Sequence, residues 1–343
     1  MAEKPAIGIA VVGCGYWGIN YVRVFSELPN SHVVAVCDMS EERLNVVKQR
    51  FPQVEVVKSV DTLFDIPGID AVVISTQAST HYEAASPCIA AKRHVLIEKP
   101  ITITTEDAQK LMDEAAAAQV TLMVGHTFIY NSGVQKVRSY IDQGNLGHIY
   151  YMYARRTNLG PIRQDVNALW DLATHDVAIF NYLLNTPPKW VSAVGSNILH
   201  REQEDVGFVA LSYGNNILGH IHASWADPNK VREVVVVGSD RRVVFDDTNP
   251  LERVRIFEKG VTTVSEKSAD SYGEYSLLMR DGDIISPKVE VSEPLKNQCR
   301  HFLECVMNNR RPMTGGQEGL DVVKVMAAIN QSMKSNGVPV ELS

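Results

Sequence analysis

The sequence has few cysteines and lacks any apolar run long enough to cross a membrane. Five cysteines occur among 343 residues, and none lies in a CxxC pair. This excludes a disulfide framework and a cysteine-based metal site, so we expect a reduced cytoplasmic protein without a bound metal. No run reaches the ~18 apolar residues that a membrane-spanning helix needs. The apolar run at residues 7–12 ends in glycines, too early for a signal peptide, and predicts a first strand.

The chain also lacks an excess of positive charge. Lysine and arginine number 33 against 40 aspartates and glutamates, which gives a net charge of −7. This balance argues against nucleic acids and anionic membranes as partners, but helix N-termini and a few lysines can still bind a small anion. The shares of 45% hydrophobic and 21% charged residues are typical of a globular protein. At about 100–200 residues per domain, the length predicts two domains.

The first part of the chain alternates short apolar runs with amphipathic stretches. Runs rich in valine and isoleucine, without polar alternation, are typical of strands buried on both faces. The expected strands are residues 7–12, 32–37, 71–75, 94–97 and 120–124, and the expected helices are 16–28, 41–51, 81–91 and 106–118. This alternation predicts an α/β Rossmann domain, a doubly wound parallel sheet, over residues 1–125.

Two of these helices carry a start signal. Thr80 with Glu83 fits a capping box before the third helix, and Thr104 with Asp107 fits a capped start of the fourth. We therefore expect both threonine side chains to accept a hydrogen bond from the first turn of the helix that follows.

Beyond residue 125 the strands follow one another without helices between them. A helix at 132–143, a strand at 149–155 and a helix at 171–184 precede runs at 190–199, 206–213, 217–224, 231–237, 242–246 and 254–258. Such a series predicts a large, mostly antiparallel open sheet. A polar excursion at 261–287 and two closing helices at 294–308 and 317–336 complete an α+β domain over residues 126–343.

A glycine-rich turn joins the first strand to the first helix. Residues 13–18 read Gly-Cys-Gly-Tyr-Trp-Gly, a GxGxxG string. Gly13 would permit the tight turn, Gly15 would let a pyrophosphate approach the backbone, and Gly18 would let the helix lie close to the strand. The free N–H groups at the helix N-terminus favour a negative charge there. The alternative is a glycine turn that only packs a helix.

Asp38 ends the second strand, 20 residues after Gly18, which is the spacing expected for an acid that binds a ribose. Its carboxylate can accept hydrogen bonds from both ribose hydroxyls and would repel a 2′-phosphate. The pattern therefore favours NAD over NADP as the cofactor.

The buried run at residues 94–97 leads into Glu98-Lys99-Pro100. The C-terminal ends of parallel strands are where such sheets bind their ligands. A lysine at that edge can donate a hydrogen bond to a reacting hydroxyl or carbonyl and can stabilise a developing alkoxide. The alternative is a solvated lysine at the end of a strand.

Asp171 and His175 lie four residues apart in an apolar helix, so they share one face. A carboxylate beside an imidazole fixes its tautomer and raises its pKa, which suits a base that removes a hydroxyl proton. A structural helix pair or cap is an equal alternative. A zinc site is not supported, since no HExxH string or cysteine pair accompanies the histidine.

Several residues near these motifs are candidates for substrate contact. Arginine and asparagine side chains suit phosphates and sugar hydroxyls, and aromatic rings can stack on a sugar. Surface or core positions are the alternative for each of them. The candidate substrate residues are Tyr130, Arg155, Asn158, Asn167 and Trp170, with Asn131 and Arg156 beside them. His220 and His222 alternate along a strand and are more typical of a sheet surface or subunit interface than of a metal site.

Together, the glycine-rich turn, Glu98-Lys99-Pro100 and Asp171-x3-His175 resemble the glucose–fructose oxidoreductase/inositol dehydrogenase family, often written Gfo/Idh/MocA. The resemblance covers nearly the whole chain and includes the string Ser75-Thr76-Gln77-Ala78-Ser79-Thr80-His81. It implies an N-terminal domain that binds NAD or NADP. It also implies a C-terminal sheet used in substrate binding and oligomerisation.

The resemblance implies roles for single residues as well. Lys99 falls on the family's catalytic lysine, His175 on its catalytic histidine, and Asp171 on the supporting aspartate. In such proteins the loop at residues 75–81 lies against the cofactor. The implied cofactor-binding residues are Gly13, Gly15, Tyr16, Trp17, Gly18, Asp38, Ser75, Thr76, Gln77, His81, Glu98 and Lys99.

Two positions depart from the family pattern, because many members have proline in place of Gln77 and glycine in place of Asn167. The strings at 155–160, 165–170 and 282–287 are similar to a branch found with nucleotide-sugar biosynthesis, which includes UDP-N-acetylglucosamine 3-dehydrogenases. The implied function is hydride transfer between nicotinamide and a sugar hydroxyl or ketone, at C3 of a UDP-N-acetylhexosamine. The sugar is expected to enter between the two domains.

Three alternatives stay open at this point. The chain could oxidise a free sugar or inositol, or oxidise its substrate transiently and regenerate NAD in each cycle. It could also be an NAD-binding sensor without turnover, although the set of Lys99, Asp171 and His175 argues against this. An open sheet further implies a homodimer or homotetramer assembled through the C-terminal sheet.

Overall fold

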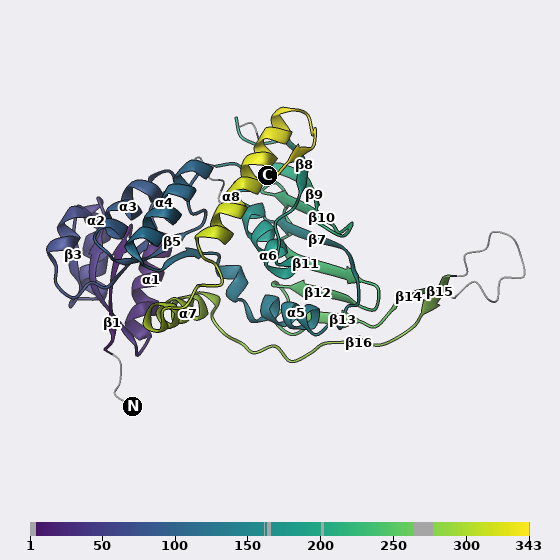
Figure 1. The fold of residues 1–343 in the computed structure, drawn as a ribbon, viewed down its shortest axis with the longest axis horizontal. Helices are drawn as coiled ribbons and strands as arrows, with labels where there is room; N and C mark the ends of the chain where they lie inside the picture. Colours follow the sequence, from purple (N-terminus) through teal and green to yellow (C-terminus); the bar gives the residue numbers. More distant parts are fainter. Residues whose placement is uncertain (1–4, 161, 163–165, 200–201, 264–276, 343) are drawn as a thin grey trace, which may run out of the picture. The chain divides into compact units, whose positions relative to one another are not determined.

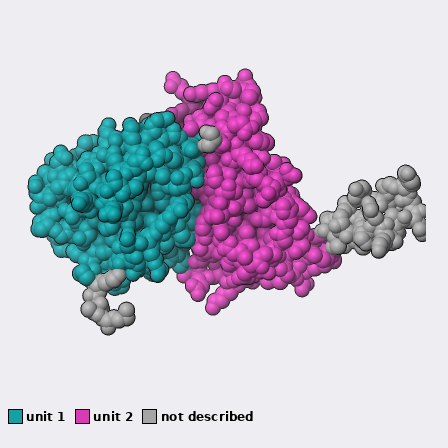
Figure 2. All heavy atoms as spheres, in the orientation of Figure 1, with its two compact units in different colours: residues 1–130, 292–324 teal, residues 131–291, 325–343 magenta. Residues whose placement is uncertain are grey.

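The computed structural model describes residues 5–160, 162, 166–199, 202–263 and 277–342. It forms two compact units, which Figure 2 shows in different colours: unit 1 is Met1–Tyr130 with Ser292–Lys324, and unit 2 is Asn131–Val291 with Val325–Ser343. A late segment of the chain thus belongs to the first unit. The boundary expected at residue 125 stays a prediction. None of the described helices combines the length and apolar character that crossing a membrane requires.

Unit 1 contains a six-stranded parallel sheet in the order β3-β2-β1-β4-β5-β6 (Figure 1). This is the strand order of a Rossmann fold, so the predicted α/β class is confirmed. The strands are β1 (Ile7–Val12), β2 (Ser31–Cys37), β3 (Glu55–Val57), β4 (Ala71–Ile74), β5 (His94–Glu98) and β6 (Leu122–Gly125). All residues of β1, β4 and β6 are buried, as expected for strands covered on both faces.

The helices of unit 1 follow the predicted order, with one addition from the end of the chain. They are α1 (Tyr16–Glu27), α2 (Glu41–Arg50), α3 (His81–Ala90), α4 (Thr105–Ala118) and α7 (Pro294–Asn308), with the short 3-10 helices η1 (Asp61–Asp65), η2 (Ala78–Thr80) and η3 (Thr127–Tyr130). The α7 helix packs on α1 and η3. Phe25 and Phe302 meet edge to face there, with 6.4 Å between ring centroids.

The two predicted helix starts have different outcomes. Thr104 caps α4 as expected, because its hydroxyl accepts a hydrogen bond from the backbone N–H of Asp107 at 3.2 Å. Thr80 makes no such cap on α3. Its hydroxyl instead donates to the Gln77 carbonyl oxygen at 2.9 Å, because the preceding residues already turn as η2. The predicted capping box at Thr80 is therefore wrong.

Unit 2 contains a nine-stranded sheet in the order β16-β13-β12-β11-β7-β10-β9-β8-β17 (Figure 1). Within the described residues of this sheet, only the β7–β10 pair is parallel, which confirms the predicted, mostly antiparallel sheet. The strands are β7 (Ile149–Thr157), β8 (Trp190–Ser196), β9 (Val206–Ser212), β10 (Leu218–Ser224), β11 (Val231–Gly238), β12 (Arg242–Asp246), β13 (Val254–Phe257), β16 (Ile284–Ile285) and β17 (Val340–Glu341).

Helices cover one face of this sheet. They are α5 (Ser132–Asp142), the π-helix η4 (Leu169–Ala173), α6 (Thr174–Leu184) and the end of α8 (Gly316–Lys334). The α5 helix packs on β12 and β13, and η4 packs on β10. Strands β14 (Gly260–Thr263) and β15 (Leu277–Arg280) form a separate small sheet. The predicted excursion at 261–287 falls here, and its part at 264–276 lies outside the described residues.

The other face of the large sheet, called the outer face, carries exposed apolar and aromatic side chains. The Phe208 ring stacks on that of His222 with 4.5 Å between centroids, and His220 lies 6.4 Å from it. The exposed members of the outer face include Tyr151, Val194, Phe208, Leu218 and His220. The two alternating histidines thus lie on the sheet surface, as their spacing indicates, and no group that could hold a metal ion is found among the described residues.

Candidate active site

The glycine-rich turn lies between β1 and α1 and is closely packed from two sides. Gly13 has φ +86°, and a Cβ on it would lie 2.8 Å from the backbone of Ser75. A Cβ on Gly18 would lie 1.9 Å from the Gly13 carbonyl oxygen. Both positions therefore require glycine for the helix and the loop after β4 to meet the turn.

The space above Gly15 is open, in contrast to its neighbours. Apart from its chain neighbours and the backbone of α1, the only described atom within 4 Å of a Cβ built there is a guanidinium nitrogen of Arg43, at 3.9 Å. Gly15 is also the N-cap of α1, which has no side-chain cap and no acidic residue in its first turn. Tyr16 and Trp17 beside it are exposed. Unused N–H groups next to open space fit the pyrophosphate of a dinucleotide.

Asp38 lies at the end of β2, directly beside this turn. Its carboxylate accepts hydrogen bonds from the backbone N–H groups of Cys14, at 2.6 Å, and Ser40, at 2.8 Å. The Arg43 guanidinium lies 3.6 Å from the same carboxylate. Burial and the Asp38 charge raise the pKa of the Cys14 thiol to about 11, so this cysteine stays protonated at neutral pH. These contacts fix the Asp38 carboxylate beside the glycine-rich turn, and its contact with a ribose stays a prediction.

The loop after β4 is tied to the turn and to the segment after β5. The Ser75 hydroxyl donates to the Gly13 carbonyl oxygen at 2.7 Å. The buried His81 ring lies 2.8 Å from the Pro100 carbonyl oxygen and 3.3 Å from that of Thr76. His81 therefore joins this loop to Pro100 through its two ring nitrogens. Gln77, in the same loop, is exposed.

Glu98 and Lys99 lie at the C-terminal end of β5, on the same edge as Asp38. Glu98 is buried, and its carboxylate accepts hydrogen bonds from the Tyr21 hydroxyl at 2.6 Å and the backbone N–H of Lys99 at 3.1 Å. The pKa of Glu98 is raised above its ordinary value, because burial outweighs the lowering by the Tyr21 hydroxyl and the Lys99 charge. Lys99 is half-buried, and a cis peptide bond joins it to Pro100.

His126 is a residue of this edge that the sequence analysis missed. It directly follows β6, whose Gly125 pairs with Glu98. The ring is 2% exposed, and neither ring nitrogen has a hydrogen-bond partner among the described residues. Burial, together with the Lys99 charge, lowers the pKa of His126 to about 3, so the ring is neutral. His126 could have been found in the sequence by the same signal that singled out Lys99, its position at the C-terminal end of a parallel strand.

In unit 2, Asp171 and His175 lie on a helix that changes type between them. The predicted single helix is wrong in this respect: Asp171 belongs to the π-helix η4, and His175 to the first turn of α6. The indole N–H of Trp225 donates to the Asp171 carboxylate at 3.4 Å. Single π-turns of this kind occur frequently at functional sites.

Asn167 starts this helical segment. Its side-chain oxygen accepts a hydrogen bond from the backbone N–H of Trp170 at 3.0 Å, and its amide donates to the Glu204 carboxylate at 2.8 Å. Asn167 thus caps the segment that carries Asp171, while the Trp170 side chain is mostly buried. Asp165, in the same sequence motif, lies outside the described residues.

The other substrate candidates have different surroundings. Arg156 is buried in a two-bond ion pair with Asp176, at 2.9 and 2.8 Å, which is a structural contact. Arg155, on the opposite side of β7, is exposed on the outer face, and Asn158 follows the strand half-exposed. Tyr130 is 3% exposed, and its hydroxyl is 2.8 Å from that of Thr314. Substrate contact by any of these residues stays a prediction.

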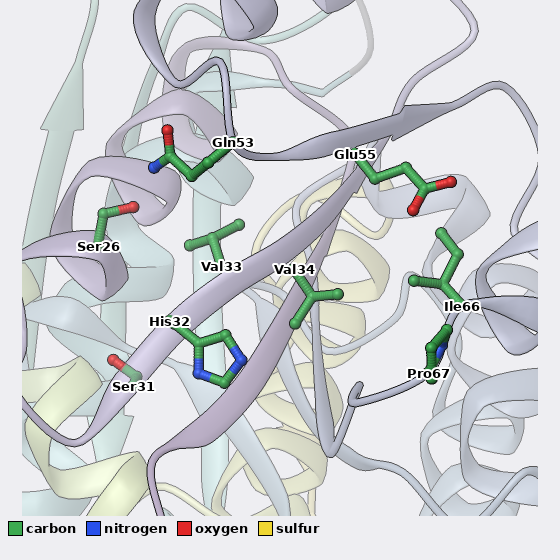
Figure 3. Close-up of a pocket in the computed structure, with 9 residues that line it drawn as sticks. All are labelled: Ser26, Ser31, His32, Val33, Val34, Gln53, Glu55, Ile66 and Pro67. Atoms are coloured by element: carbon green, nitrogen blue, oxygen red, sulfur yellow. The ribbon is translucent and has the colours of Figure 1, made fainter.

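A pocket at the other end of the unit 1 strands does not belong to this site. Figure 3 shows its lining around the start of β2 and β3. Because parallel strands place all their C-terminal ends on one edge, this pocket is on the edge opposite to Asp38 and Lys99. The lining residues are Ser26, Ser31, His32, Val33, Val34, Gln53, Glu55, Ile66 and Pro67.

The structure therefore brings the predicted cofactor residues of unit 1 together along one sheet edge. Of the predicted catalytic residues, Lys99 belongs to unit 1, whereas Asp171 and His175 belong to unit 2. The residue roles stay predictions.

Comparison with known proteins identifies both parts of the chain. Residues 7–126 match the model of an oxidoreductase family with an NAD-binding Rossmann fold, and residues 134–244 match the GFO/IDH/MocA C-terminal domain. Myo-inositol 2-dehydrogenase of Thermotoga maritima is 24% identical, over 95% of this chain and 96% of that protein. UDP-N-acetylglucosamine 3-dehydrogenase of Acidithiobacillus ferrooxidans is 28% identical, over 74% of this chain and 78% of that protein.

Solved structures share the fold over the whole chain. The WlbA dehydrogenase from Bordetella pertussis, in complex with NADH and UDP-GlcNAcA, has a TM-score of 0.82 at 21% identity. The match covers 100% of this chain and 99% of that one. At this identity the likeness establishes the fold alone.

Proposed function

Because the chain belongs to the Gfo/Idh/MocA family of NAD-binding oxidoreductases, we propose that its substrate is a nucleotide-linked sugar. The chain is an NAD-dependent sugar oxidoreductase that acts on a CH–OH group. The proposed substrate is a UDP-N-acetylhexosamine, oxidised or reduced at C3. The observation that carries this choice is the similarity to UDP-N-acetylglucosamine 3-dehydrogenase over three quarters of the chain.

The residues of the site are proposed to divide the work as follows. The turn at Gly13 and Gly15, with Asp38, holds the cofactor, which supplies the hydride acceptor when bound. His175 removes the proton from the sugar hydroxyl, and Asp171 orients its imidazole. Lys99 stabilises the negative charge that develops on the substrate oxygen. In the opposite direction the same groups return the proton to a ketone.

The test is the formation of NADH after the protein is mixed with NAD and a panel of sugars, half free and half linked to UDP or TDP. We expect an increase of absorbance at the NADH band with nucleotide sugars only. Formation of NADH with free sugars or inositol alone would contradict the proposed substrate and favour the second candidate, a free-polyol dehydrogenase. The full-length similarity to myo-inositol 2-dehydrogenase supports that alternative.

Replacing Asp38 with serine tests the proposed preference for NAD. The variant removes the carboxylate that would repel a 2′-phosphate, so the ratio of kcat/KM with NAD to that with NADP should fall by about tenfold or more. Asp70→Ser is a matched control, since Asp70 also accepts a backbone N–H, from Gly8 at 2.8 Å, but at the opposite edge of the sheet. An unchanged ratio in Asp38→Ser would contradict the assigned role.

We also propose that the outer face of unit 2 joins copies of this chain. Exposed side chains such as Phe208, Leu218 and Tyr151 form an apolar surface that water disfavours. Pairing of this face in a homodimer or homotetramer would bury it. A mass equal to one chain in light scattering would contradict this arrangement.

A further inference from the structure

A continuous chain of hydrogen bonds, buried at its centre and part-buried at both ends, runs from η3 through α7 and α1 to the backbone of Lys99. The Thr127 hydroxyl donates to the Gln298 side-chain oxygen at 2.8 Å, and the Gln298 amide donates to the Tyr21 hydroxyl at 2.8 Å. Tyr21 donates in turn to Glu98 at 2.6 Å, whose second oxygen accepts the Lys99 backbone N–H. We call these four side chains, Thr127, Gln298, Tyr21 and Glu98, the Tyr21 chain. All of them belong to unit 1.

Every donor in the Tyr21 chain points towards Glu98. A carboxylate that accepts on both oxygens is satisfied in its ionised form, and a series of aligned donors strengthens each bond. Tyr21 and Gln298 are fully buried, so water does not compete for these bonds. The Tyr21 chain therefore favours a negative charge on Glu98 in a place where burial opposes it.

The Tyr21 hydroxyl lies close against the end of β6, at Gly125. A Cβ on Gly125 would lie 3.1 Å from the Tyr21 oxygen and 3.4 Å from the Glu98 Cα. Glycine at the end of β6 thus lets the hydroxyl lie against the strand. A phenylalanine at position 21 would fill the same core, so packing alone does not explain the hydroxyl.

The ionisable groups around Glu98 come from each element that packs on it. The α1 helix contributes Tyr21, α7 contributes Cys299, and the ends of β5 and β6 contribute Lys99 and His126. Burial and the Glu98 charge raise the pKa values of Tyr21 and Cys299, so both stay neutral, as does His126. Among these groups, only Lys99 is a cation that balances Glu98.

We propose that Tyr21 and Gln298 are positioning residues for Lys99. They keep the Glu98 carboxylate ionised and in place. Glu98 in turn fixes the Lys99 backbone and balances the Lys99 charge. The proposal rests on the proposed function, since Lys99 is taken to act on the substrate oxygen. Tyr21 and Gln298 contact neither substrate nor reacting atoms in this scheme, and they act through Glu98 alone.

The first test needs no substrate. Infrared difference spectra of the full chain, titrated from neutral to acidic pH, follow the carboxylic-acid band, which Glu98→Gln assigns by its loss. In Tyr21→Phe, Glu98 loses a donor to its ionised form, so the band should appear at a pH about one unit higher than in the parent protein. Tyr82→Phe is the matched control, because it removes a Tyr–Glu bond of 3.0 Å to Glu114, away from this edge.

The second test uses turnover with the substrate found by the panel. Tyr21→Phe should lower kcat by about tenfold, with the dissociation constant of NADH unchanged by fluorescence titration. Because Glu98 protonates at higher pH in the variant, the acidic limb of the kcat profile should move to higher pH. Gln298→Met should act in the same direction but less, and it replaces Tyr21→Phe if that variant does not fold.

These outcomes separate the proposal from the proposed function. An unshifted infrared band in Tyr21→Phe overturns the proposal, whatever the activity. A shifted band with an unchanged kcat and pH profile also overturns it, because Glu98 would then not act on Lys99. A parent protein that turns over no sugar at all refutes the proposed function, while the infrared result still decides whether Tyr21 keeps Glu98 ionised.

Discussion

Replacing Lys99 with methionine is expected to lower kcat by about a thousandfold. Methionine keeps the unbranched side chain as far as Cε but removes the charged ammonium group that would stabilise a developing oxyanion at the end of β5. Binding of NAD should weaken by no more than about tenfold, since one hydrogen bond near the cofactor is lost. Single-turnover formation of NADH, measured beside an NAD titration, separates the two effects.

Lys110→Met is the matched control for this variant. Lys110 lies in the same unit, in an exposed ion pair with Asp107 on α4, at 3.2 Å. Its loss should leave both kcat and NAD binding unchanged. His175→Gln extends the test to unit 2 and should lower kcat by about a hundredfold or more, since it removes a general base. Full turnover in Lys99→Met or His175→Gln would refute the role given to that residue.

Acid should destabilise unit 1 through His126. The folded pKa of about 3 lies below the ordinary histidine value of 6.5, so between these pH values the unfolded chain binds a proton that the folded chain does not. The free energy of unfolding therefore falls as the pH drops from about 6.5 towards 3, by up to about 5 kcal/mol from this one group. Above pH 6.5 this contribution is fully retained.

The difference between the parent protein and His126→Leu isolates this effect. Other, half-buried histidines with lowered pKa values, such as His94 and His301, destabilise both proteins equally in acid. His126→Leu should therefore show a flatter dependence of the unfolding free energy on pH, measured by urea denaturation from pH 7 to 4. Replacement of His32, an exposed histidine of the same unit, should leave the slope as it is. Equal slopes in His126→Leu and the parent would contradict a neutral, buried ring.

Much of the fold was predictable because its signals are local. The buried runs of β1, β4 and β5 have few polar interruptions, and the glycine-rich turn has its strand, helix and Asp38 at the expected spacing. β3 was missed because it has three partly exposed residues at the sheet edge, where no apolar run is needed. The π-turn at Asp171 was missed because the apolar pattern of a helix does not report its hydrogen-bond register.

The site was less predictable where it depends on contacts between distant parts of the chain. Gln298 donates to Tyr21 across 277 positions of sequence, and no spacing rule connects a helix near the end of the chain to the first one. Position at a sheet edge was enough to single out Lys99. The pKa of His126 is lowered mainly by burial, and the extent of that burial can be seen only in the packed structure.

The split composition of unit 1 has a consequence for synthesis of the protein. The six strands are complete once residue 125 has left the ribosome, but α7 is made more than 160 residues later. Until then the Tyr21 hydroxyl has no Gln298 donor and the Phe25 ring no Phe302 neighbour. Part of the core of the nascent Rossmann domain thus stays exposed to water while every strand of the large sheet except β17 is translated. A fragment that stops near residue 130 lacks α7 permanently and keeps this part of the core exposed. A fragment that also carries residues 292–324 restores α7 and covers that part of the core.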